Sequence, residues 1–318
     1  MTPAQLCQIE RERVSPTLKT LERIATALDM TVVELLGGKG AESDKEKTVP
    51  RVTLSDDYMT LRAWEPDATK ALTAILPREK KIDAAEDVRG ISSACNIALN
   101  YAQAKLDGAG TVLAEEVRAA LGAGTVPFCD LPSCLEFKGV RIYKVRLPKT
   151  TQSVSFWNKS RNSLAIALNE WNTSERDLYR LAYEVGSACL FVSSGSSAFD
   201  ETIWAHRFLT DFTKAFLMPA VMVRQYVAET GIERSSWTFS TLCKLKVRFG
   251  VSAESFALRL EELGLIAPTL RLKLRKTLRM YYKEHPRRME PPPNLSPLTL
   301  GSRNSILLEQ ADQSGKTK

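Results

Sequence analysis

Histidine is almost absent from this 318-residue chain, which contains only His206 and His285. A helical zinc peptidase holds its metal with two histidines at positions i and i+4, because those positions share one face of the helix. No pair of histidines with that spacing occurs anywhere in the sequence. We therefore expect neither a zinc-dependent active site nor any other metal or cofactor.

Long apolar runs and paired cysteines are also missing. No apolar stretch approaches the roughly 20 residues that a membrane helix requires, and residues 1–11 lack the apolar core of a secretory signal. The six cysteines are scattered and form no Cys-x-x-Cys pair, which is typical of reduced thiols packed in a protein core. These absences predict a cytoplasmic protein without membrane contact, disulfide bonds or a zinc knuckle.

The positive charge of the chain is concentrated at its C-terminal end. Residues 271–318 contain eleven Lys and Arg against four Asp and Glu, which accounts for the whole formal net charge of +7. Such a segment can bind phosphate groups by releasing their counterions, so it is compatible with a nucleic-acid partner. A solvated, disordered end is the alternative interpretation of the same composition.

The first 84 residues divide into a helical unit and a less regular segment. Within residues 1–38, apolar side chains recur at helical spacing, and Thr31 and Glu34 form a capping box for a second, short helix. Residues 39–84 begin as a polar linker and continue as a segment of ambiguous structure. One helix is expected there, near residues 68–76.

Residues 85–270 have the pattern of a mixed domain of helices and strands, and 271–318 that of a basic helix and a disordered tail, unfolded after Pro286. Three strands are expected from short runs of apolar residues, at 140–145, 153–157 and 164–168. One helix is expected to begin with Ser174 as its N-cap. The other expected helices lie near 86–106, 113–121, 201–229, 238–249, 253–264 and 269–284.

The helix that begins at Ser174 carries an acidic residue at the centre of a zinc-peptidase-like spacing. Glu184 stands where such a helix has its general base, while Tyr183 and Ser187 stand at the two metal-ligand positions. A phenol and a serine hydroxyl are poor zinc ligands beside imidazole, and a serine nucleophile would need a nearby base. We therefore predict no catalytic residue here and expect Glu184 to pair with Arg180, one turn back.

Residues 6–36 resemble the second half of an Xre-type, lambda-repressor-like helix-turn-helix. The similarity runs in order through Ile-Glu-Arg, Thr-Leu and Ile-Ala-x-Ala-Leu to Leu-Leu. Glu12 replaces the glycine of the family, and the first two helices of the family are missing, so we expect an N-terminally incomplete domain. The resemblance implies that Gln5 and Gln8 face the major groove, where glutamine can bind adenine, and that Arg11 lies near a phosphate.

Residues 125–266 resemble the ImmA/IrrE peptidase domain. Similar motifs occur in the order of the family, at residues 126–132, 139–142, 164–169, 180–190, 205–208, 215–219 and 249–266. Residues 180–190 are similar to the zinc helix of the family, with Tyr183 and Ser187 in place of its two histidines. Glu201 lies near the place of the third metal ligand, and the spacing leaves its register open. The resemblance implies a zincin-like domain whose metal site is degenerate.

With these resemblances, the sequence predicts an α+β, mostly helical protein, in which a partial helix-turn-helix unit precedes a zincin-like domain with a small three-stranded sheet. The implied function is that of a DNA-binding transcriptional regulator. Its peptidase-like domain would be catalytically inactive and would serve ligand sensing, partner binding or dimerisation. The expected partners are DNA, a second copy of the chain, and a small ligand or protein at the former active site.

Two alternatives stay open on the sequence. The first is an active metallopeptidase with unusual ligands, which its zinc content would reveal. The second is an interaction or antitoxin-like protein that no longer binds DNA, which the incomplete helix-turn-helix favours.

Overall fold

The computed structural model describes residues 57–61, 67–90, 94–95, 97, 108–128, 130–193 and 203–285, together with Thr20 and Glu290. The chain divides into two compact units, Met1–Thr48 and Val49–Lys318. Except for Thr20, every described residue belongs to the second unit. The expected partial helix-turn-helix at 1–38, with Gln5, Gln8 and Arg11, lies outside the described residues.

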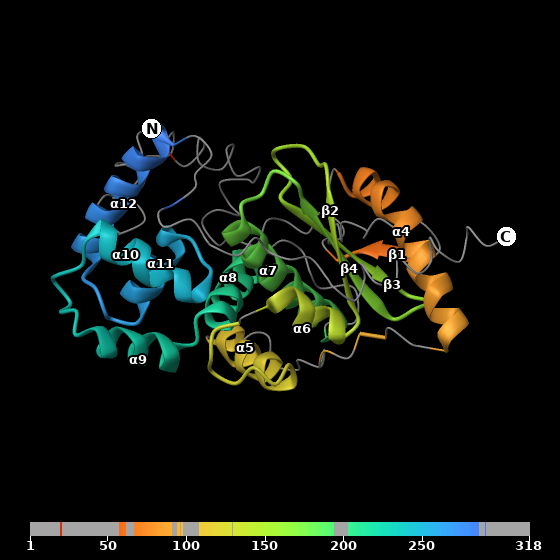
Figure 1. The fold of residues 1–318 in the computed structure, drawn as a ribbon, viewed down its shortest axis with the longest axis horizontal. Helices are drawn as coiled ribbons and strands as arrows, with labels where there is room; N and C mark the ends of the chain where they lie inside the picture. The colour runs from red at the N-terminus through yellow and green to blue at the C-terminus, as the bar shows by residue number, and fades with distance from the viewer. Residues whose placement is uncertain are drawn as a thin grey trace. The chain divides into compact units, whose positions relative to one another are not determined.

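A four-stranded sheet forms the centre of the second unit (Figure 1). Its strands are β1 (Tyr58–Thr60), β2 (Val140–Val145), β3 (Ser153–Asn158) and β4 (Ser163–Asn169), in the order β1-β3-β4-β2. β2 lies parallel to β4, and the other pairs are antiparallel. The three expected strands are confirmed to within one or two residues, and the mostly helical α+β class is confirmed with them.

The fourth strand, β1, corrects the expected three-stranded sheet. It pairs with the edge of β3, with Met59 opposite Trp157. The strand has only three residues, which is too short for an alternating pattern to stand out within the segment of ambiguous structure that follows the polar linker. The expected start of the domain at residue 85 was therefore wrong, because the sheet already includes residues 58–60.

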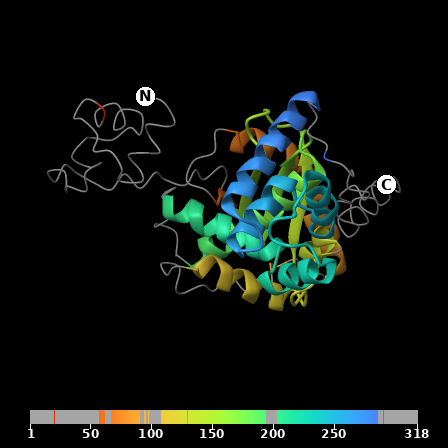
Figure 2. The same ribbon diagram turned by 90° about the vertical axis from the view of Figure 1, so that its left-hand side faces the viewer.

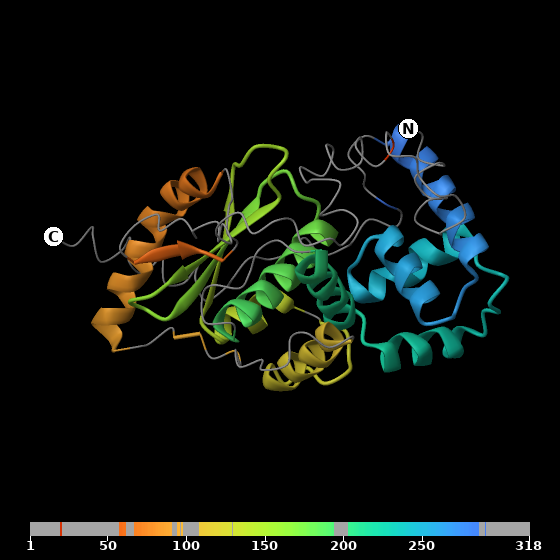
Figure 3. The same ribbon diagram turned by 180° about the vertical axis from the view of Figure 1, so that it is seen from behind.

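Alternate residues of the strands point into two separate cores. On one face, helix α4 (Ala68–Arg89) packs Ala71, Ile75 and Ile82 against strand residues that include Val154 and Phe156. On the other face, the strands contact helix α7 (Ser174–Ser193), as Figures 1 and 3 show from opposite sides. Each face is covered, which explains why β3 and β4 are buried along their whole length.

Helix α4 is longer than the helix expected at 68–76. It ends at Arg89, within the range of a second helix that was expected at 86–106. Gly90 stops it with a positive φ of 64°, a conformation that glycine adopts without strain. Beyond it, the Cys95 N–H donates to the carbonyl oxygen of Asn162 at 2.8 Å, so this part of the chain is bound to the β3–β4 turn. Most of the remaining residues of that expected helix lie outside the described ones.

Helix α8 (Ile203–Leu217) packs closely against two neighbours, α5 (Ala109–Ala120) and α7. Two glycines permit the approach. A Cβ atom on Gly110 of α5 would lie 2.4 Å from the Phe208 carbonyl oxygen, and one on Gly186 of α7 would lie 2.6 Å from Phe212 Cδ1. Both distances are shorter than any side chain tolerates, so the sequence can place three helices together only with glycine at these positions.

The C-terminal part of the unit is helical. The single helix expected at 201–229 is two helices, α8 and α9 (Ala220–Thr230), because Pro219 adopts an extended conformation with ψ of 134° between them. The helices expected at 113–121, 238–249, 253–264 and 269–284 are confirmed with shifted ends. They are α5, α10 (Phe239–Lys246) with the 3-10 turn η1 (Val247–Phe249), α11 (Ala253–Glu262) and α12 (Pro268–Glu284).

Helix α12 packs on α10 and α11 (Figure 2). The chain was expected to be unfolded after Pro286, yet Glu290 is only 3% exposed. The rest of the tail, 286–289 and 291–318, is not among the described residues. None of the helices in the described part of the chain combines the length and apolar character that a membrane crossing requires.

Candidate functional site

The helix expected to carry the vestigial site begins at Ser174, one residue earlier than an N-cap at Ser174 implies, and its cap is Thr173. The Thr173 Oγ1 accepts the Arg176 N–H at 3.4 Å, and the Thr173 carbonyl oxygen accepts the Asp177 N–H at 2.9 Å. Glu175 and Asp177 then place negative charge in the first turn of α7, where the helix dipole favours it. The prediction of Ser174 as N-cap was wrong by one residue, because Ser174 is already helical.

Two serines of β3 bind the acidic residue of the site. Glu184 has no exposed surface, and its Oε1 and Oε2 accept hydrogen bonds from Ser153 Oγ at 2.6 Å and Ser155 Oγ at 2.5 Å. The two serines are two residues apart, so they lie on the same face of the strand. A buried carboxylate needs such donors, since its charge has lost its hydration.

Arg180, the partner expected for Glu184, has a different role. Its Nε donates to Gln152 Oε1 at 2.7 Å, and its guanidinium carbon lies 5.4 Å from the centre of the Tyr183 ring. The arginine therefore ties α7 to the start of β3 and covers the tyrosine. The prediction that Arg180 pairs with Glu184 was wrong, because Ser153 and Ser155 of β3 bind Glu184 instead. The sequence alone does not show that these two serines lie beside α7.

The two residues at the ligand positions lie inside the core of the unit. Tyr183 is 8% exposed and Ser187 is 6% exposed. The Ser187 Oγ donates to the Tyr183 carbonyl oxygen at 3.1 Å, a bond that serine commonly makes to the preceding helical turn. The serine hydroxyl is thereby engaged with its own helix.

These residues do not fit a zinc ion. A zinc site needs imidazole, thiolate or carboxylate donors, and the positions four apart on α7 supply a phenol and an engaged hydroxyl. Across the described part of the chain, no three His, Cys, Asp or Glu residues are grouped so that they could hold a metal. Glu201, near the expected place of a third ligand, lies outside that part. The geometry of Glu184 is that of a carboxylate bound by hydroxyl donors.

Asn169, the asparagine at the end of β4, holds the loop that leads into β3. Its Nδ2 donates to the carbonyl oxygens of Pro148 and Thr151 at 2.8 and 2.6 Å, and its Oδ1 accepts the Leu147 N–H at 3.3 Å. The side chain is buried, so these bonds replace water. Asn169 thus fixes where β3 begins, and with it the two serines that bind Glu184.

A buried ionic cluster lies on the opposite face of the sheet. Arg141 of β2 contacts Glu79, Asp83 and Glu86 of α4 at 2.9, 2.8 and 2.9 Å. Tyr58 and Tyr143 donate their hydroxyls to Glu79, and burial together with that carboxylate raises the pKa of both phenols. The charged groups of the cluster pair with one another across the α4–β2 contact, so we interpret the cluster as the anchor of α4 on the sheet.

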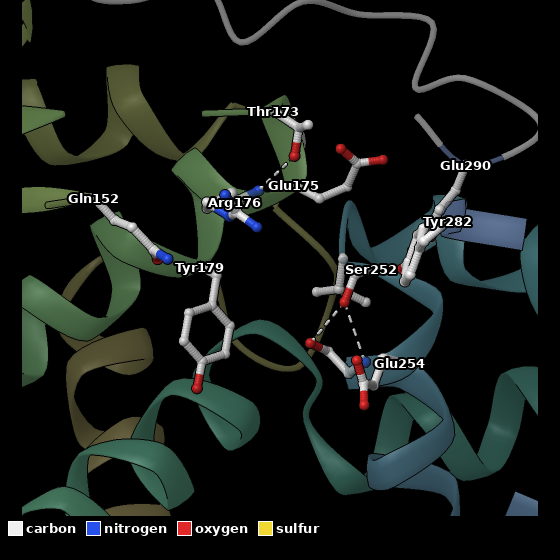
Figure 4. Close-up of a pocket in the computed structure, with 11 residues that line it drawn as sticks. Gln152, Thr173, Glu175, Arg176, Tyr179, Ser252, Glu254, Tyr282 and Glu290 are labelled. Atoms are coloured by element: carbon white, nitrogen blue, oxygen red, sulfur yellow. Dashed lines mark hydrogen bonds between the residues drawn. The ribbon is translucent and has the colours of Figure 1, made fainter. Parts of the chain in front are cut away.

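A cavity of about 270 Å³ opens at the N-terminal ends of α7 and α11. Figure 4 shows Glu175 and Tyr179 on the α7 side, and Glu290 and Tyr282 on the other. The sequence did not predict this cavity, because its walls come from segments that are about a hundred residues apart. The one feature of the sequence that could have indicated this region is the short polar stretch at Ser252. Ser252 caps α11, and its Oγ accepts the Ser255 N–H at 3.2 Å.

Four described cysteines, Cys95, Cys134, Cys189 and Cys243, carry free thiols. Cys189 lies one turn beyond Glu184 and is fully buried, and burial raises the pKa of its thiol far above the usual range. A thiol held in its neutral form is a poor nucleophile. We therefore do not include Cys189 in the site.

Comparison with known proteins bears on the region that contains α7. A family model described as Peptidase_M78, IrrE N-terminal-like domain, matches residues 136–261. No curated protein matches the chain. The matched region includes strands β2 to β4, helix α7 with Glu184, and most of α11. It also lies within residues 125–266, where the motifs were found, and over this region the chain is similar to the IrrE N-terminal-like domain.

Proposed function

We propose that this chain is a DNA-binding transcriptional regulator whose peptidase-like domain is catalytically inactive and serves ligand sensing, partner binding or dimerisation. The similarity of residues 136–261 to the IrrE N-terminal-like domain supports the peptidase-like part. The resemblance of residues 6–36 to an Xre-type helix-turn-helix supports the DNA-binding part. The two supports are independent, and they are tested separately below.

The observation that carries the proposed inactivity is the environment of Glu184. A general base must reach the attacking water within hydrogen-bond distance. Glu184 has no exposed surface, and a serine hydroxyl occupies each of its oxygens. Ser187, at the second ligand position, is bound to the backbone of its own helix. The same helix therefore offers neither a metal-ligand pair nor an accessible base.

Metal content tests this proposal directly. The purified protein, equilibrated with micromolar zinc and then desalted, should contain much less than one equivalent by elemental analysis. Glu184→Gln and the exposed control Glu170→Gln should give the same low value. One equivalent of tightly held zinc that is lost only in Glu184→Gln would contradict the proposal and support a metallopeptidase with unusual ligands.

A gel shift on the promoter region of its own gene tests the DNA-binding part. In a protein with a complete helix-turn-helix, Gln5→Ala and Gln8→Ala should each reduce discrimination between operator and random DNA by about 1–3 kcal/mol, because each removes a base contact. Arg11→Ala should weaken both kinds of binding alike. Failure of the full chain to bind any DNA would favour an interaction or antitoxin-like protein instead. Homodimerisation is read from the mass of the complex.

A further inference from the structure

A lysine with no exposed surface lies at the end of α10. The Lys246 Nζ contacts Glu175 Oε1 of α7 and Glu290 Oε2, which follows α12, each at 2.9 Å. Burial alone disfavours the charged form, but the two carboxylates more than offset this effect, so the pKa of Lys246 is raised. The ammonium group is therefore retained, and it needs anionic partners.

The carboxylate of Glu290 is bound by three different kinds of donor. Besides Lys246, its Oε2 accepts the Ala253 N–H at 2.7 Å, and its Oε1 accepts the hydroxyl of Tyr282. A cation, a backbone N–H at the start of a helix and a phenol are the donors from which a carboxylate-binding site is built. The carboxylate that fills them comes from a different segment than the helix it binds.

The N-terminus of α11 does not depend on Glu290 for its cap. Ser252 already accepts the Ser255 N–H and fills the usual capping position. Glu290 binds the adjacent Ala253 N–H in addition. The donors that surround Glu290 therefore exceed what the capping of α11 requires, and this separates them from an ordinary helix end.

The cavity of about 270 Å³ adjoins the Glu290 carboxylate, and Glu290 and Tyr282 are part of its wall (Figure 4). Its other walls include the acidic Glu175 and Glu254, the basic Arg176, and polar side chains such as Gln152. The space therefore suits the body of a small polar molecule whose carboxylate reaches Lys246.

We propose that Lys246, the Ala253 N–H and the Tyr282 hydroxyl form a carboxylate-binding site in which Glu290 is a tethered ligand, and that a small free carboxylic acid competes with it by also filling the adjoining cavity. The tether gives Glu290 an effective concentration on the order of millimolar. A monocarboxylate that binds these donors alone displaces Glu290 poorly, while a larger acid gains from the cavity. Exchange frees the Glu290 carboxylate from these donors and leaves Lys246 paired with Glu175 of α7.

The test uses the full chain carrying Glu290→Ala. This substitution removes a CH2–COO⁻ group, which is about the size of acetate. We expect this variant to have a lower Tm than the wild type and to regain the difference with sodium acetate in a saturable manner. Sodium chloride at equal ionic strength should not restore it. The exposed control Glu233→Ala should show neither the loss nor the acetate effect. If acetate and chloride act alike on Glu290→Ala, the proposal is overturned.

A second measurement addresses competition and remains useful if Glu290→Ala folds poorly. Glutarate is titrated calorimetrically into the wild type and into Glu290→Gln, which keeps the size of the side chain and removes its charge. We expect glutarate to bind Glu290→Gln at least about 10-fold more tightly, because the tethered competitor is weakened. Adding Tyr282→Phe to Glu290→Gln should reduce that affinity. Equal affinities in the wild type and Glu290→Gln would show that glutarate does not use this site.

Discussion

Ser187 donates its hydroxyl to the carbonyl oxygen of Tyr183 at 3.1 Å, so the residues at the two positions four apart on α7 bind each other. In a zinc-peptidase helix those positions point two imidazoles at one ion. Here the Ser187 side chain is hydrogen-bonded to the backbone of Tyr183. The neighbouring Glu184 carboxylate accepts hydrogen bonds from Ser153 and Ser155 of β3. These contacts explain how three polar side chains of α7 are accommodated in a packed core.

Rebuilding the histidine pair should create measurable zinc affinity. Ser187→His alone should bind no zinc at micromolar concentration, because one imidazole and one buried carboxylate make a weak site. Tyr183→His with Ser187→His should bind more zinc, since it restores two imidazoles at i and i+4. Calorimetric titration of zinc into both variants is the measurement. A double variant that folds and yet binds no more zinc than the single one would show that the site has lost the space for a metal.

Removing one serine beside Glu184 should destabilise the protein. Ser155→Ala leaves a buried carboxylate oxygen without its donor, and the free energy of unfolding should fall by about 1–3 kcal/mol. The exposed control Ser236→Ala should change it by less than about 0.5 kcal/mol. Urea denaturation gives both values. In a Glu184→Gln background the effect of Ser155→Ala should shrink, and an unchanged effect would mean that the serine does not act through the carboxylate.

Replacing Gly186 should destabilise the protein because a larger side chain would overlap the Phe212 ring. Truncating Phe212 should remove this effect. A Cβ atom on Gly186 would lie 2.6 Å from Phe212 Cδ1, so Gly186→Ala should destabilise the protein by about 1–3 kcal/mol. In a Phe212→Ala background the overlap disappears, and alanine should then be neutral or stabilising by up to about 1 kcal/mol through its helix propensity. Chemical denaturation of the four proteins completes the cycle. Equal effects in both backgrounds would contradict the steric explanation.

The basic side chains of α12 should contribute to DNA affinity unequally. Arg271 and Arg275 are paired with Glu261 and Glu254, whereas Lys276 and Arg279 are exposed. Lys276→Gln with Arg279→Gln should therefore lower the slope of log affinity against log salt by about 2 on random DNA. Lys80→Gln, an exposed lysine of α4, is the control. Fluorescence anisotropy at several salt concentrations decides, and an unchanged slope would make α12 a solvated surface only.

The strands were predictable because each buries an apolar run that the sequence displays directly. Residues 164–168 form a short apolar run of Leu, Ala and Ile, which is typical of a strand buried on both faces, and β4 is such a strand. Strand β1 was not predictable, since three residues carry no periodicity and its pairing with β3 depends on a partner about a hundred residues away. The break at Pro219 was visible in the sequence, but apolar spacing continues on both sides of it and suggested one helix.

The site was predictable only in part. The sequence singles out Glu184, Tyr183 and Ser187, because they stand at fixed spacing in one helix. It does not identify Ser153 and Ser155 as partners, since that contact depends on how α7 lies on the sheet. Two serines at alternate positions of an otherwise apolar strand were the available signal, because buried hydroxyls need an acceptor. The contact of Lys246 with Glu290 joins segments whose adjacency only the fold decides.

On each face of the sheet a buried carboxylate of the covering helix binds a strand: Glu79 of α4 on one face and Glu184 of α7 on the other. Apolar side chains alone would let a helix slide or rotate on a sheet with little change in buried area, since the hydrophobic effect has no direction. Glu79 must reach Arg141 on one face, and Glu184 must reach two serine hydroxyls on the other. These contacts form in only one position of each helix along the sheet. Moving α7 by a single turn would leave Glu184 among apolar neighbours with its charge uncompensated. Glu184 therefore fixes the position of α7 along its sheet, as Glu79 does for α4.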